Sequence, residues 1–577
     1  MVTAENLNAP KRTLPPCRAA CPADVNVQGY VALIQQGKFK EAVTLIRKNM
    51  PFPAICGRVC FSPCQDACIR KDIDNPVGVR YLKRLAADIE FEQGRIKPTP
   101  IPKIHTEKVA IIGAGPAGLS AAYELARLGY PVTVFERMQK CGGMMMYGIP
   151  NHRLQKYVVA NEIAYIEDLG VEIKTGVEFG KDINLEDLRR DSYKAVFITI
   201  GAQASQELGI PGEDLEGVFH AVEFLRDLCL EKPVAIGETV VVIGGGNSAI
   251  DAARTSLRLG AKEVTILYRR SRREMPALPY EIEAAEEEGI RFEFLVSPIQ
   301  IISDDGRVKA VECLRMKLGE PDTSGRRRPI PIENSEHTYD IETVIVAVGQ
   351  QSEATCLPPI LLDERGRRVQ VDPVTLETRI PSVFAGGDVA TGPASVIEAV
   401  GAGRRAAVSI DRYLKGKDLR SDREPEVEET TWVRDITTIK KKPERYTIAP
   451  TDIGRLNVSF EDADRLLAKT KKDAVLESRR CLECGPCEEC LEREELCDAD
   501  KAVVDENLCS GCNTCVLVCP FDAIEKNELG IAQVNETLCK GCGTCSATCP
   551  ERAITMKKFS DVQILASVVS AVRGKGE

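Results

Sequence analysis

The sequence predicts an α/β protein with parallel sheets in its central part and small cysteine-rich domains at its two ends. Between about residues 105 and 415, short apolar runs such as VAIIG, AVFITIG and TVVVIGGG alternate with helical segments, which is typical of a doubly wound sheet. Nineteen of the 23 cysteines lie instead near the two ends. A chain of 577 residues is too long for one hydrophobic core, so several domains are expected.

Charge and hydropathy exclude several classes of protein. The formal net charge is -10, and no long block of Lys and Arg occurs, so a nucleic-acid partner is not expected. The first twenty residues lack the apolar region of a signal peptide, and no run of about 18 apolar residues predicts a membrane span. We therefore expect a cytoplasmic protein, in which clustered cysteines are metal ligands more often than disulfides.

The carboxy-terminal end contains a cysteine repeat that is typical of iron–sulfur proteins. VDENLCSGCNTCVLVCPFDAIEK recurs thirty residues later as VNETLCKGCGTCSATCPERAITM. Each half has the spacing C-x2-C-x2-C-x3-C-P of a bacterial two-cluster ferredoxin, in which the fourth cysteine binds the other run's cluster. The predicted ligands of one [4Fe–4S] cluster are Cys509, Cys512, Cys515 and Cys549, and those of the second are Cys539, Cys542, Cys545 and Cys519. Zinc sites are the alternative, but they do not require the x3-Cys-Pro ending.

Two further groups of cysteines predict about two to three more clusters. RRCLECGPCEECLEREELC favours a [4Fe–4S] cluster over zinc or free thiols, and its spacing does not show which four of five cysteines bind. These five are Cys481, Cys484, Cys487, Cys490 and Cys497. At the amino end, six cysteines in 52 residues favour one or two clusters over a helical domain with buried free thiols. These six are Cys17, Cys21, Cys56, Cys60, Cys64 and Cys68.

The segment KVAIIGAGPAGLSAAYELARLGYPVTVFE predicts a first dinucleotide site. It places a strand, a glycine-rich turn, a helix and a second strand in the order of the Rossmann fingerprint. Gly113, Gly115 and Gly118 let a pyrophosphate approach the amino end of the helix, and Glu136 accepts a hydrogen bond from a ribose hydroxyl. An acid at this position opposes a 2′-phosphate, so the site suits FAD or NAD.

A second dinucleotide site is predicted in TVVVIGGGNSAIDAARTSLRLGAKEVTILYRR. Its glycine-rich turn contains Gly244 and Gly246, followed by Asn247 and Ser248. The second strand ends in arginines where the first copy has an acid, namely Arg269 and Arg270. Guanidinium groups there would pair with a 2′-phosphate, which favours NADP(H) over NAD(H). The alternatives are a solvated basic turn or a contact with a partner subunit.

Late in the central region, VFAGGDVATGPASVIEAVGAGRRAA predicts a return to the first dinucleotide domain. Gly387 and Asp388 follow a strand and precede a helix. Asp388 is placed to bond a flavin ribityl hydroxyl, and the helix amino end to face the flavin ring. The FAD domain is therefore expected to be discontinuous, with the second Rossmann unit inserted into it.

The chain from Cys17 to about residue 410 resembles the small (beta) subunit of bacterial glutamate synthase. The same core occurs in the large subunit of NADH-dependent ferredoxin:NADP oxidoreductase and in the amino-terminal half of dihydropyrimidine dehydrogenase. The matching stretches include PFPAICGRVCFSPCQDAC, CGGMMMYGIPNHRL, IGGGNSAIDAAR and GGDVATGP. The resemblance implies FAD in the first site, NADP(H) in the second, and Gly143, Met144 and Arg153 along the flavin. A lone Cys141 in this stretch makes disulfide substrates unexpected.

The sequence departs from this family at its amino end. The resemblance implies a C-x2-C motif before Cys17 and a Gln or Glu ligand near Lys83 or Arg84, and neither is present. RRCLECG at 479 to 485 looks like the missing motif moved to the other end of the chain. Our hypothesis is that Cys481 and Cys484 complete a cluster with Cys17 and Cys68.

These features divide the chain into consecutive parts. The FAD-binding domain is discontinuous, the NAD(P)H-binding domain is inserted in it, and a linker with some helix precedes the last cysteine groups. The predicted boundaries are 1–104 for the helical iron–sulfur domain, 105–238 with 351–416 for FAD, 239–350 for NAD(P)H, 417–480 for the linker, 481–500 for the extra cysteine segment, 501–558 for the ferredoxin-like domain and 559–577 for a terminal helix.

The function predicted from these parts is electron transfer between NADP(H), FAD and a chain of [4Fe–4S] clusters. Ferredoxin or partner redox subunits of a multisubunit complex are the expected partners, and the resemblance allows electron bifurcation. The cofactors carry the chemistry, so no catalytic side chain is required. Two alternatives are a glutamate synthase small chain that feeds a glutaminase subunit, and an electron relay whose pyridine nucleotide site is inactive.

Overall fold

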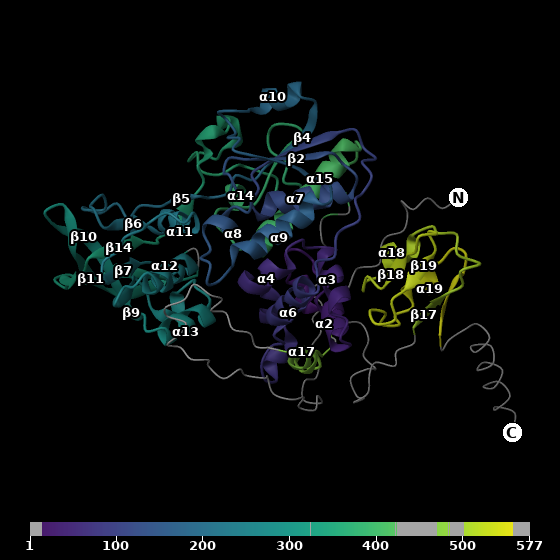
Figure 1. The fold of residues 1–577 in the computed structure, drawn as a ribbon, viewed down its shortest axis with the longest axis horizontal. Helices are drawn as coiled ribbons and strands as arrows, with labels where there is room; N and C mark the ends of the chain where they lie inside the picture. Colours follow the sequence, from purple (N-terminus) through teal and green to yellow (C-terminus); the bar gives the residue numbers. More distant parts are fainter. Residues whose placement is uncertain are drawn as a thin grey trace.

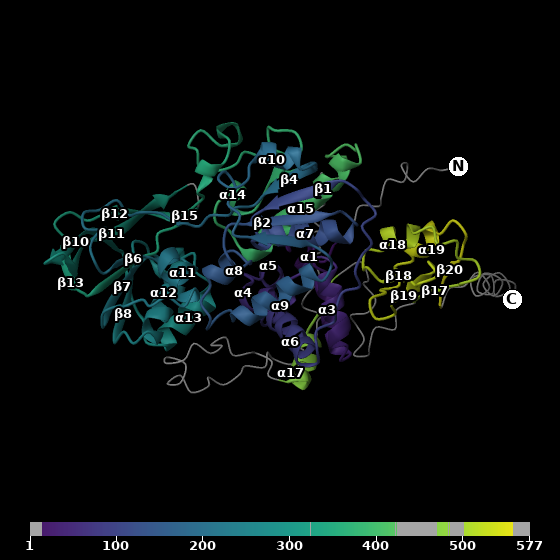
Figure 2. The same cartoon turned by 45° about the horizontal axis from the view of Figure 1, so that its top comes forward.

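The computed structural model describes residues 14–322, 325–421, 423, 470–482, 484 and 501–557. Figures 1 and 2 show helices of the amino-terminal domain between two sheet-containing domains and a small carboxy-terminal module. The predicted ligands Cys487, Cys490 and Cys497 lie outside the described residues, as do the predicted terminal helix and most of the linker.

The amino-terminal domain is helical because prolines and caps start short amphipathic segments. Pro16, Pro53 and Pro63 occupy first-turn positions, where a missing N–H costs nothing. Asn26 caps the next helix, because its side chain accepts a hydrogen bond from Gly29 N at 2.9 Å. The helices are α1 (Pro16–Ala19), α2 (Val27–Gln35), α3 (Phe39–Arg47), α4 (Pro53–Val59), α5 (Pro63–Asp66), η2 (Ile69–Asp72) and α6 (Val79–Glu92).

The first sheet is parallel and has the strand order β16-β4-β1-β2-β3. Its strands are β1 (Lys108–Ile112), β2 (Val132–Glu136), β3 (Glu172–Thr175), β4 (Tyr193–Ile198) and β16 (Val383–Ala385). The last strand returns from far along the chain and pairs Val383 with Val196. This return confirms the predicted discontinuous domain. Its helices are α7 (Pro116–Arg127), α8 (Met144–Tyr147), α9 (Lys156–Glu167), α10 (Leu185–Arg190), α14 (Asp388–Thr391) and α15 (Val396–Leu414), with short turns η4 (Ala354–Cys356) and η5 (Pro359–Leu361).

The second sheet is also parallel, in the order β6-β14-β7-β8-β9. Its strands are β6 (Val218–His220), β7 (Thr239–Ile243), β8 (Glu263–Tyr268), β9 (Arg291–Phe294) and β14 (Thr343–Val346). An antiparallel extension contains β10 (Val296–Asp304), β11 (Arg307–Pro321), β12 (Arg327–Pro331) and β13 (His337–Asp340). The helices are α11 (Ala221–Cys229), α12 (Asn247–Arg258), η3 (Arg272–Glu274) and α13 (Pro279–Glu287). Strand β6 precedes the predicted start of this domain at 239, and β5 (Ala204–Ser205) pairs with β15 (Gln350–Gln351).

The carboxy-terminal module repeats one unit twice, as its sequence repeat predicts. It contains β17 (Ala502–Val504), α18 (Thr514–Val518), β18 (Ile524–Lys526), β19 (Ala532–Val534), α19 (Thr544–Thr548) and β20 (Ile554–Met556). The strands pair antiparallel, β17 with β20 and β18 with β19. Together with the two parallel sheets and the helical amino-terminal domain, this module confirms the predicted fold class.

One continuous buried core joins several of these parts. It includes Ile34 and Ile55 of the amino-terminal helices, Leu119 of α7 and Ile524 of the carboxy-terminal module. Glu162 of α9 caps α4, since its carboxylate accepts hydrogen bonds from the backbone N–H groups of residues 54 and 55 at 2.8 and 3.0 Å. The amino-terminal domain is thereby fixed against the first sheet domain.

Neither membrane spans nor disulfides are found in the described part of the chain. None of its helices is both long and apolar enough to cross a bilayer. All of its cysteines are free thiols.

Candidate functional site

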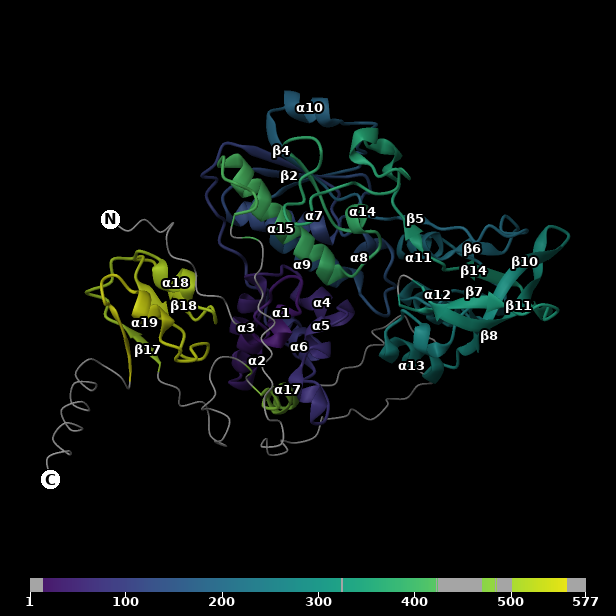
Figure 3. The same cartoon turned by 180° about the vertical axis from the view of Figure 1, so that it is seen from behind.

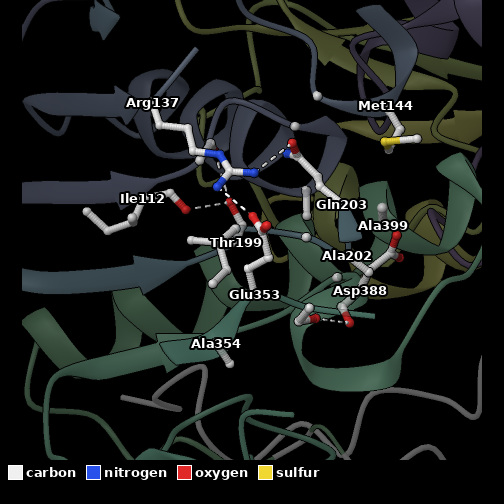
Figure 4. A pocket seen from close by; sticks show the side chains of 18 of the residues that line it. Ile112, Arg137, Met144, Thr199, Ala202, Gln203, Glu353, Ala354, Asp388 and Ala399 are labelled. Carbon is white, nitrogen blue, oxygen red and sulfur yellow. Dashed lines mark hydrogen bonds and ion pairs between the residues drawn. The ribbon is translucent and has the colours of Figure 1, made fainter. Parts of the chain in front are cut away.

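A cavity of about 640 Å³ lies at the carboxyl ends of the first sheet's strands. Residues at the ends of β1 and β2 and residues that directly follow β4 and β16 line it, together with the amino ends of α7 and α15. Figure 4 shows Thr199, Asp388 and Met144 around this space. Open α/β sheets bind ligands at this edge, so the cavity is the candidate dinucleotide site.

Gly113 and Gly115 line this cavity, and each of the three predicted glycines has its own steric role. Gly113 has a φ of 105°, and a Cβ there would lie 2.5 Å from Thr199 O. A Cβ on Gly118 would lie 2.1 Å from Gly113 O, so the helix could not pack this close to the strand. At Gly115 nothing lies within 4 Å of the Cβ position. Open space at the amino end of α7 suits a pyrophosphate, which helix N–H groups and the helix dipole stabilise.

Two carboxylates, those of Glu136 and Asp388, line the cavity. Glu136 accepts hydrogen bonds from Ala114 N at 2.8 Å and Met138 N at 2.9 Å, and burial raises its pKa. Asp388 accepts one from Ala394 N at 3.2 Å, and burial raises the pKa of Asp388 to about 7. Both have acceptor capacity left for the hydroxyl groups of a sugar or ribityl chain.

The cavity also contains an ion pair that the sequence analysis missed. Arg137 donates to Glu353 at 2.6 Å and to Gln203 at 3.2 Å, and Figure 4 shows its side chain between these two residues. The three residues come from segments far apart in the chain. The only sequence signal was that Arg137 directly follows Glu136.

Arg153 is not among the residues that line this cavity, contrary to the position expected along the flavin. It is buried, and its Nη1 contacts Asp251 at 2.6 Å while its Nε contacts Glu281 at 3.0 Å. Both acids belong to helices of the second sheet domain, α12 and α13. A buried guanidinium needs such partners, so here Arg153 joins the two nucleotide domains. Gly143 and Met144 do line the cavity.

The second glycine-rich turn has the same local geometry as the first. Gly244 has a φ of 149°, and a Cβ there would lie 2.3 Å from Ala347 O. At Gly246 the nearest atom to a Cβ is Pro276 Cγ, 4.0 Å away, so the amino end of α12 is open. Asn247 accepts a hydrogen bond from Leu278 N at 3.1 Å, which holds the following loop beside this turn, and Ser248 lies in the first turn of α12.

The two arginines predicted to bind a 2′-phosphate have different surroundings in the structure. Arg269 is exposed at the end of β8. Arg270 is buried and donates to Asp322 at 2.7 Å and to Arg327 O at 2.8 Å. It therefore anchors the β11–β12 hairpin, which leaves Arg269 as the better-placed group for a 2′-phosphate.

The eight cysteines of the carboxy-terminal module surround two separate cavities. Cys509, Cys512, Cys515 and Cys549 line one. Cys519, Cys539, Cys542 and Cys545 line the other. These are the same two sets into which the repeat divides the cysteines, with one thiol of each set taken from the other half. The arrangement of four thiols around each space suits a [4Fe–4S] cluster.

Four amino-terminal cysteines interact electrostatically with a buried lysine. Lys83 is 7% exposed. Burial lowers the pKa of its ammonium group, but electrostatic interaction with neighbouring cysteines outweighs burial and raises it overall. Those cysteines are Cys60, Cys56, Cys64 and Cys21. A cation among four thiols can offset the negative charge of a thiolate-bound cluster.

A second amino-terminal group gathers around Cys17. Burial raises the pKa of Cys17 well above its usual range, and neighbouring thiols raise it further. These thiols belong to Cys481, Cys64, Cys484 and Cys68. Within the described residues, no three His, Cys, Asp or Glu side chains converge closely enough to hold a single metal ion. A [4Fe–4S] cluster spreads its thiolates around a cube, which single-ion geometry does not reproduce.

The segment that carries Cys481 and Cys484 is built into the amino-terminal domain. Helix α17 (Lys471–Ser478) packs on α2 and α6. Arg480 is 1% exposed, and it contacts Asp74 at 2.9 Å and Glu477 at 2.7 Å. Gln28 of α2 donates to Cys484 O. A buried charge with two ionic partners holds this segment firmly in place.

Comparison with known proteins identifies the central and terminal regions. The pyridine nucleotide-disulphide oxidoreductase model matches residues 107–403, which is more than half of the chain. The chain belongs to that family. The model of dihydropyrimidine dehydrogenase domain II, 4Fe-4S cluster, matches residues 11–95, and a 4Fe-4S dicluster domain matches residues 502–556.

Three curated relatives extend this match. The chain is 44% identical to NADP(+)-dependent formate dehydrogenase subunit beta of Moorella thermoacetica, over 69% of this chain and 60% of the relative. It is 41% identical to NADPH-Fe(3+) oxidoreductase subunit beta of Geobacter sulfurreducens, over 69% and 64%. It is 36% identical to the glutamate synthase [NADPH] small chain of Escherichia coli, over 70% of this chain and 89% of the relative. The chain spans less than two thirds of the length of the first two.

These matches confirm the predicted resemblance and the predicted cofactor classes. The family member is an oxidoreductase that binds FAD and NADP(H), and its two 4Fe-4S regions hold several [4Fe–4S] clusters. The open turn at Gly115 and the carboxylates of Glu136 and Asp388 fit FAD in the cavity. The individual ligands of each cluster remain predictions.

Asp388 supplies a test of the FAD assignment. Asp388→Ala removes the carboxylate that lines the cavity, and we expect FAD to dissociate about tenfold to a hundredfold more readily, the effect of losing one hydrogen bond to a charged group. FAD retention after gel filtration and fluorescence titration of FAD into the flavin-free protein measure this. Asp227→Ala, at an exposed ion pair with Lys232, is the control. Equal FAD affinity in both variants would contradict the assignment.

Lys83 supplies a test of the amino-terminal thiol group. A buried cation favours the reduced, more negative state of a nearby cluster, so Lys83→Met should make the midpoint potential of one cluster more negative. The expected change is on the order of 100 mV, for a charge several ångströms away at an effective dielectric constant of about 20. Redox titration followed by electron paramagnetic resonance (EPR) measures it. Lys83→Arg retains the charge, and a shift of similar size in that variant would rule out an electrostatic cause.

Proposed function

We propose that this chain is the subunit that carries electrons between NADPH and a partner redox subunit or ferredoxin. The observation that carries the proposal is the combination, in one chain, of an FAD cavity, a second nucleotide turn and thiol groups at both ends. When bound, FAD accepts a hydride from NADPH and releases electrons singly, which matches it to one-electron clusters. The relatives' printed names, two of them subunits beta, support a multisubunit setting.

The residues of this chain serve binding and orientation in the proposed reaction. Glu136 and Asp388 hold sugar and ribityl hydroxyls, and the amino end of α7 holds the pyrophosphate. Arg269 selects the 2′-phosphate of NADPH. No proton needs to be moved by a histidine, which agrees with the four histidines in the sequence.

The proposed cluster ligands divide into four sets. The module has the two sets around its cavities. At the amino end, one set surrounds Lys83, and the second joins the α1 region to the segment after α17. The two amino-terminal sets are Cys21, Cys56, Cys60 and Cys64, and Cys17, Cys68, Cys481 and Cys484.

A glutamate synthase small chain is the second candidate function. The Escherichia coli small chain supports it, because the match covers 89% of that protein. That match covers 70% of this chain. Residues 502–556 of this chain match a separate model, the 4Fe-4S dicluster domain. The added module favours transfer to ferredoxin or to another redox subunit.

Anaerobic titration with NADPH tests the proposed function. We expect the flavin absorbance to bleach and EPR signals of reduced [4Fe–4S] clusters to appear in the same sample, because both cofactor types are held by one chain. NADH at equal concentration is the comparison. A flavin that dithionite reduces but NADPH does not would show an electron relay with an inactive pyridine nucleotide site.

Arg269 and Arg270 test the nucleotide preference. Arg269→Ala should raise the KM for NADPH about tenfold to a hundredfold and leave the KM for NADH unchanged, because only NADPH has a 2′-phosphate that can accept a hydrogen bond from the guanidinium group.

Arg270→Ala should instead lower the melting temperature, because it removes the contacts that anchor the β11–β12 hairpin. Arg291→Ala, at an exposed pair with Glu263, is the control. Equal losses for NADPH and NADH in Arg269→Ala would contradict the assignment.

A further inference from the structure

The carboxy-terminal module lies against the amino-terminal helices, about 500 residues earlier in the sequence. Figures 1 and 3 show the module beside α2 and α3 from opposite directions. The two parts share the buried core that includes Ile34 and Ile524. Side chains on both parts also form specific polar contacts, which determine the module's orientation.

Arg18 is the centre of this contact. It lies in α1 directly after Cys17 and is 3% exposed. Its Nη1 donates to Asp522 Oδ2 at 2.8 Å and to Pro520 O at 3.2 Å, while its Nε donates to Asp24 at 2.6 Å. A guanidinium with several acceptors in fixed positions allows one orientation of the opposing turn.

Asn26 and two lysines extend the contact on either side of Arg18. Asn26 caps α2 with its oxygen and donates through Nδ2 to Phe521 O at 2.9 Å. Lys48 forms an ion pair with Glu525, and Lys38 donates to Thr537 at 3.2 Å. The exposed lysine contacts add less than the buried ones, because solvent screens them.

Because of these contacts, one particular side of the module faces the amino-terminal domain. Pro520 and Phe521 accept from the amino-terminal domain, and they also line the cavity of Cys519, Cys539, Cys542 and Cys545. None of these contacts with the amino-terminal domain reaches a residue that lines the other cavity, the one around Cys512. Exposure alone does not distinguish the two sides, because Cys512 and Cys542, one in each cavity, are both exposed. Leu517 of α18 is 77% exposed, and Leu529, next to the Gly530 whose carbonyl oxygen approaches Gly511 of this cavity, is 82% exposed.

We propose that Arg18 and Asn26 form an intramolecular dock, and that electrons enter the module at the docked cavity of Cys519, Cys539, Cys542 and Cys545, here called the entry side. Electrons then leave at the other cavity, lined by Cys509, Cys512, Cys515 and Cys549, which is the exit side and faces a separate redox protein. Arg18 joins the two thiol groups directly, since it follows Cys17 and contacts the residue after Cys519. This inference rests on the proposed function and deepens it by giving the order of transfer and the residues that set it.

The electron balance of this order is simple. One electron crosses the dock at a time, and no bond or proton moves: the amino-terminal side is oxidised by one electron as the module is reduced by one. NADPH supplies two electrons per molecule oxidised. Arg18 and Asn26 act as positioning residues and do not themselves change oxidation state.

Asp522→Lys tests the dock from the module side, away from the amino-terminal thiols. A lysine there opposes Arg18, and like charges across an interface separate it. Hydrogen exchange of residues 520–526 should become faster. In stopped-flow experiments with NADPH, flavin reduction should keep its rate, while reduction of the module's clusters, followed by rapid-freeze EPR, should slow at least about tenfold.

Three comparisons make the result specific. Glu506→Lys makes a change of charge of the same size at an exposed position of the module, and it should change neither exchange at residues 520–526 nor the reduction rates. Asp522→Asn should lie between Asp522→Lys and the unchanged protein. Arg18→Ala should reproduce the effect of Asp522→Lys. Combining Arg18→Ala with Asp522→Asn should add little, because both substitutions remove the same contact between Arg18 and Asp522.

The outcomes separate the dock from the proposed function. Faster exchange in Asp522→Lys with an unchanged rate of reduction of the module's clusters would contradict the proposal that electrons enter the module at the docked side. Unchanged exchange would overturn the dock itself. If NADPH does not bleach the flavin of the unchanged protein, the proposed function fails, and photochemical reduction of the flavin then drives the same measurement of module reduction.

Discussion

Buried positive charge beside buried thiols is the interaction on which the amino-terminal domain depends. Arg18, Arg70, Lys83 and Arg480 are each less than 9% exposed. Removing such groups from water is costly unless ionic partners replace the lost hydration. The arginines have aspartates within hydrogen-bond distance, and Lys83 has neighbouring cysteines that would be thiolates when they bind a cluster. A domain that holds thiolate-bound clusters requires this compensation, because each cluster adds negative charge in a place that water does not reach.

The same requirement explains why distant segments meet in this domain. Arg480 brings the segment after α17 to Asp74, and Arg18 brings the carboxy-terminal module to α1. Helix α15 extends from the nucleotide cavity to the amino-terminal domain, where a Cβ on Gly401 would lie 2.4 Å from Pro22 O. The helical domain therefore contacts both the FAD cavity's helix and the module, which is the position expected of a connection between them.

The sequence predicted features whose geometry is local. The glycines at 113, 115 and 118 and the cysteine runs of the module follow from spacing alone, because a turn or loop of a few residues determines their positions. Arg137, Arg153 and Arg270 could not be placed in this way. Each is bound to residues that are adjacent only after folding, and a guanidinium reaches whichever carboxylate the tertiary structure presents. The contact of Cys481 with the amino end was predicted only by comparison with the family's motif order.

Iron-edge anomalous diffraction from crystals of the protein would show directly whether clusters lie among the buried amino-terminal cysteines, because it locates iron independently of activity. We expect a cubane-sized iron peak between Cys17, Cys68, Cys481 and Cys484, a second beside Lys83, and one in each cavity of the module. A peak bound by Cys481 and Cys484 together with Cys487 and Cys490, with none beside Cys17, would contradict this expectation.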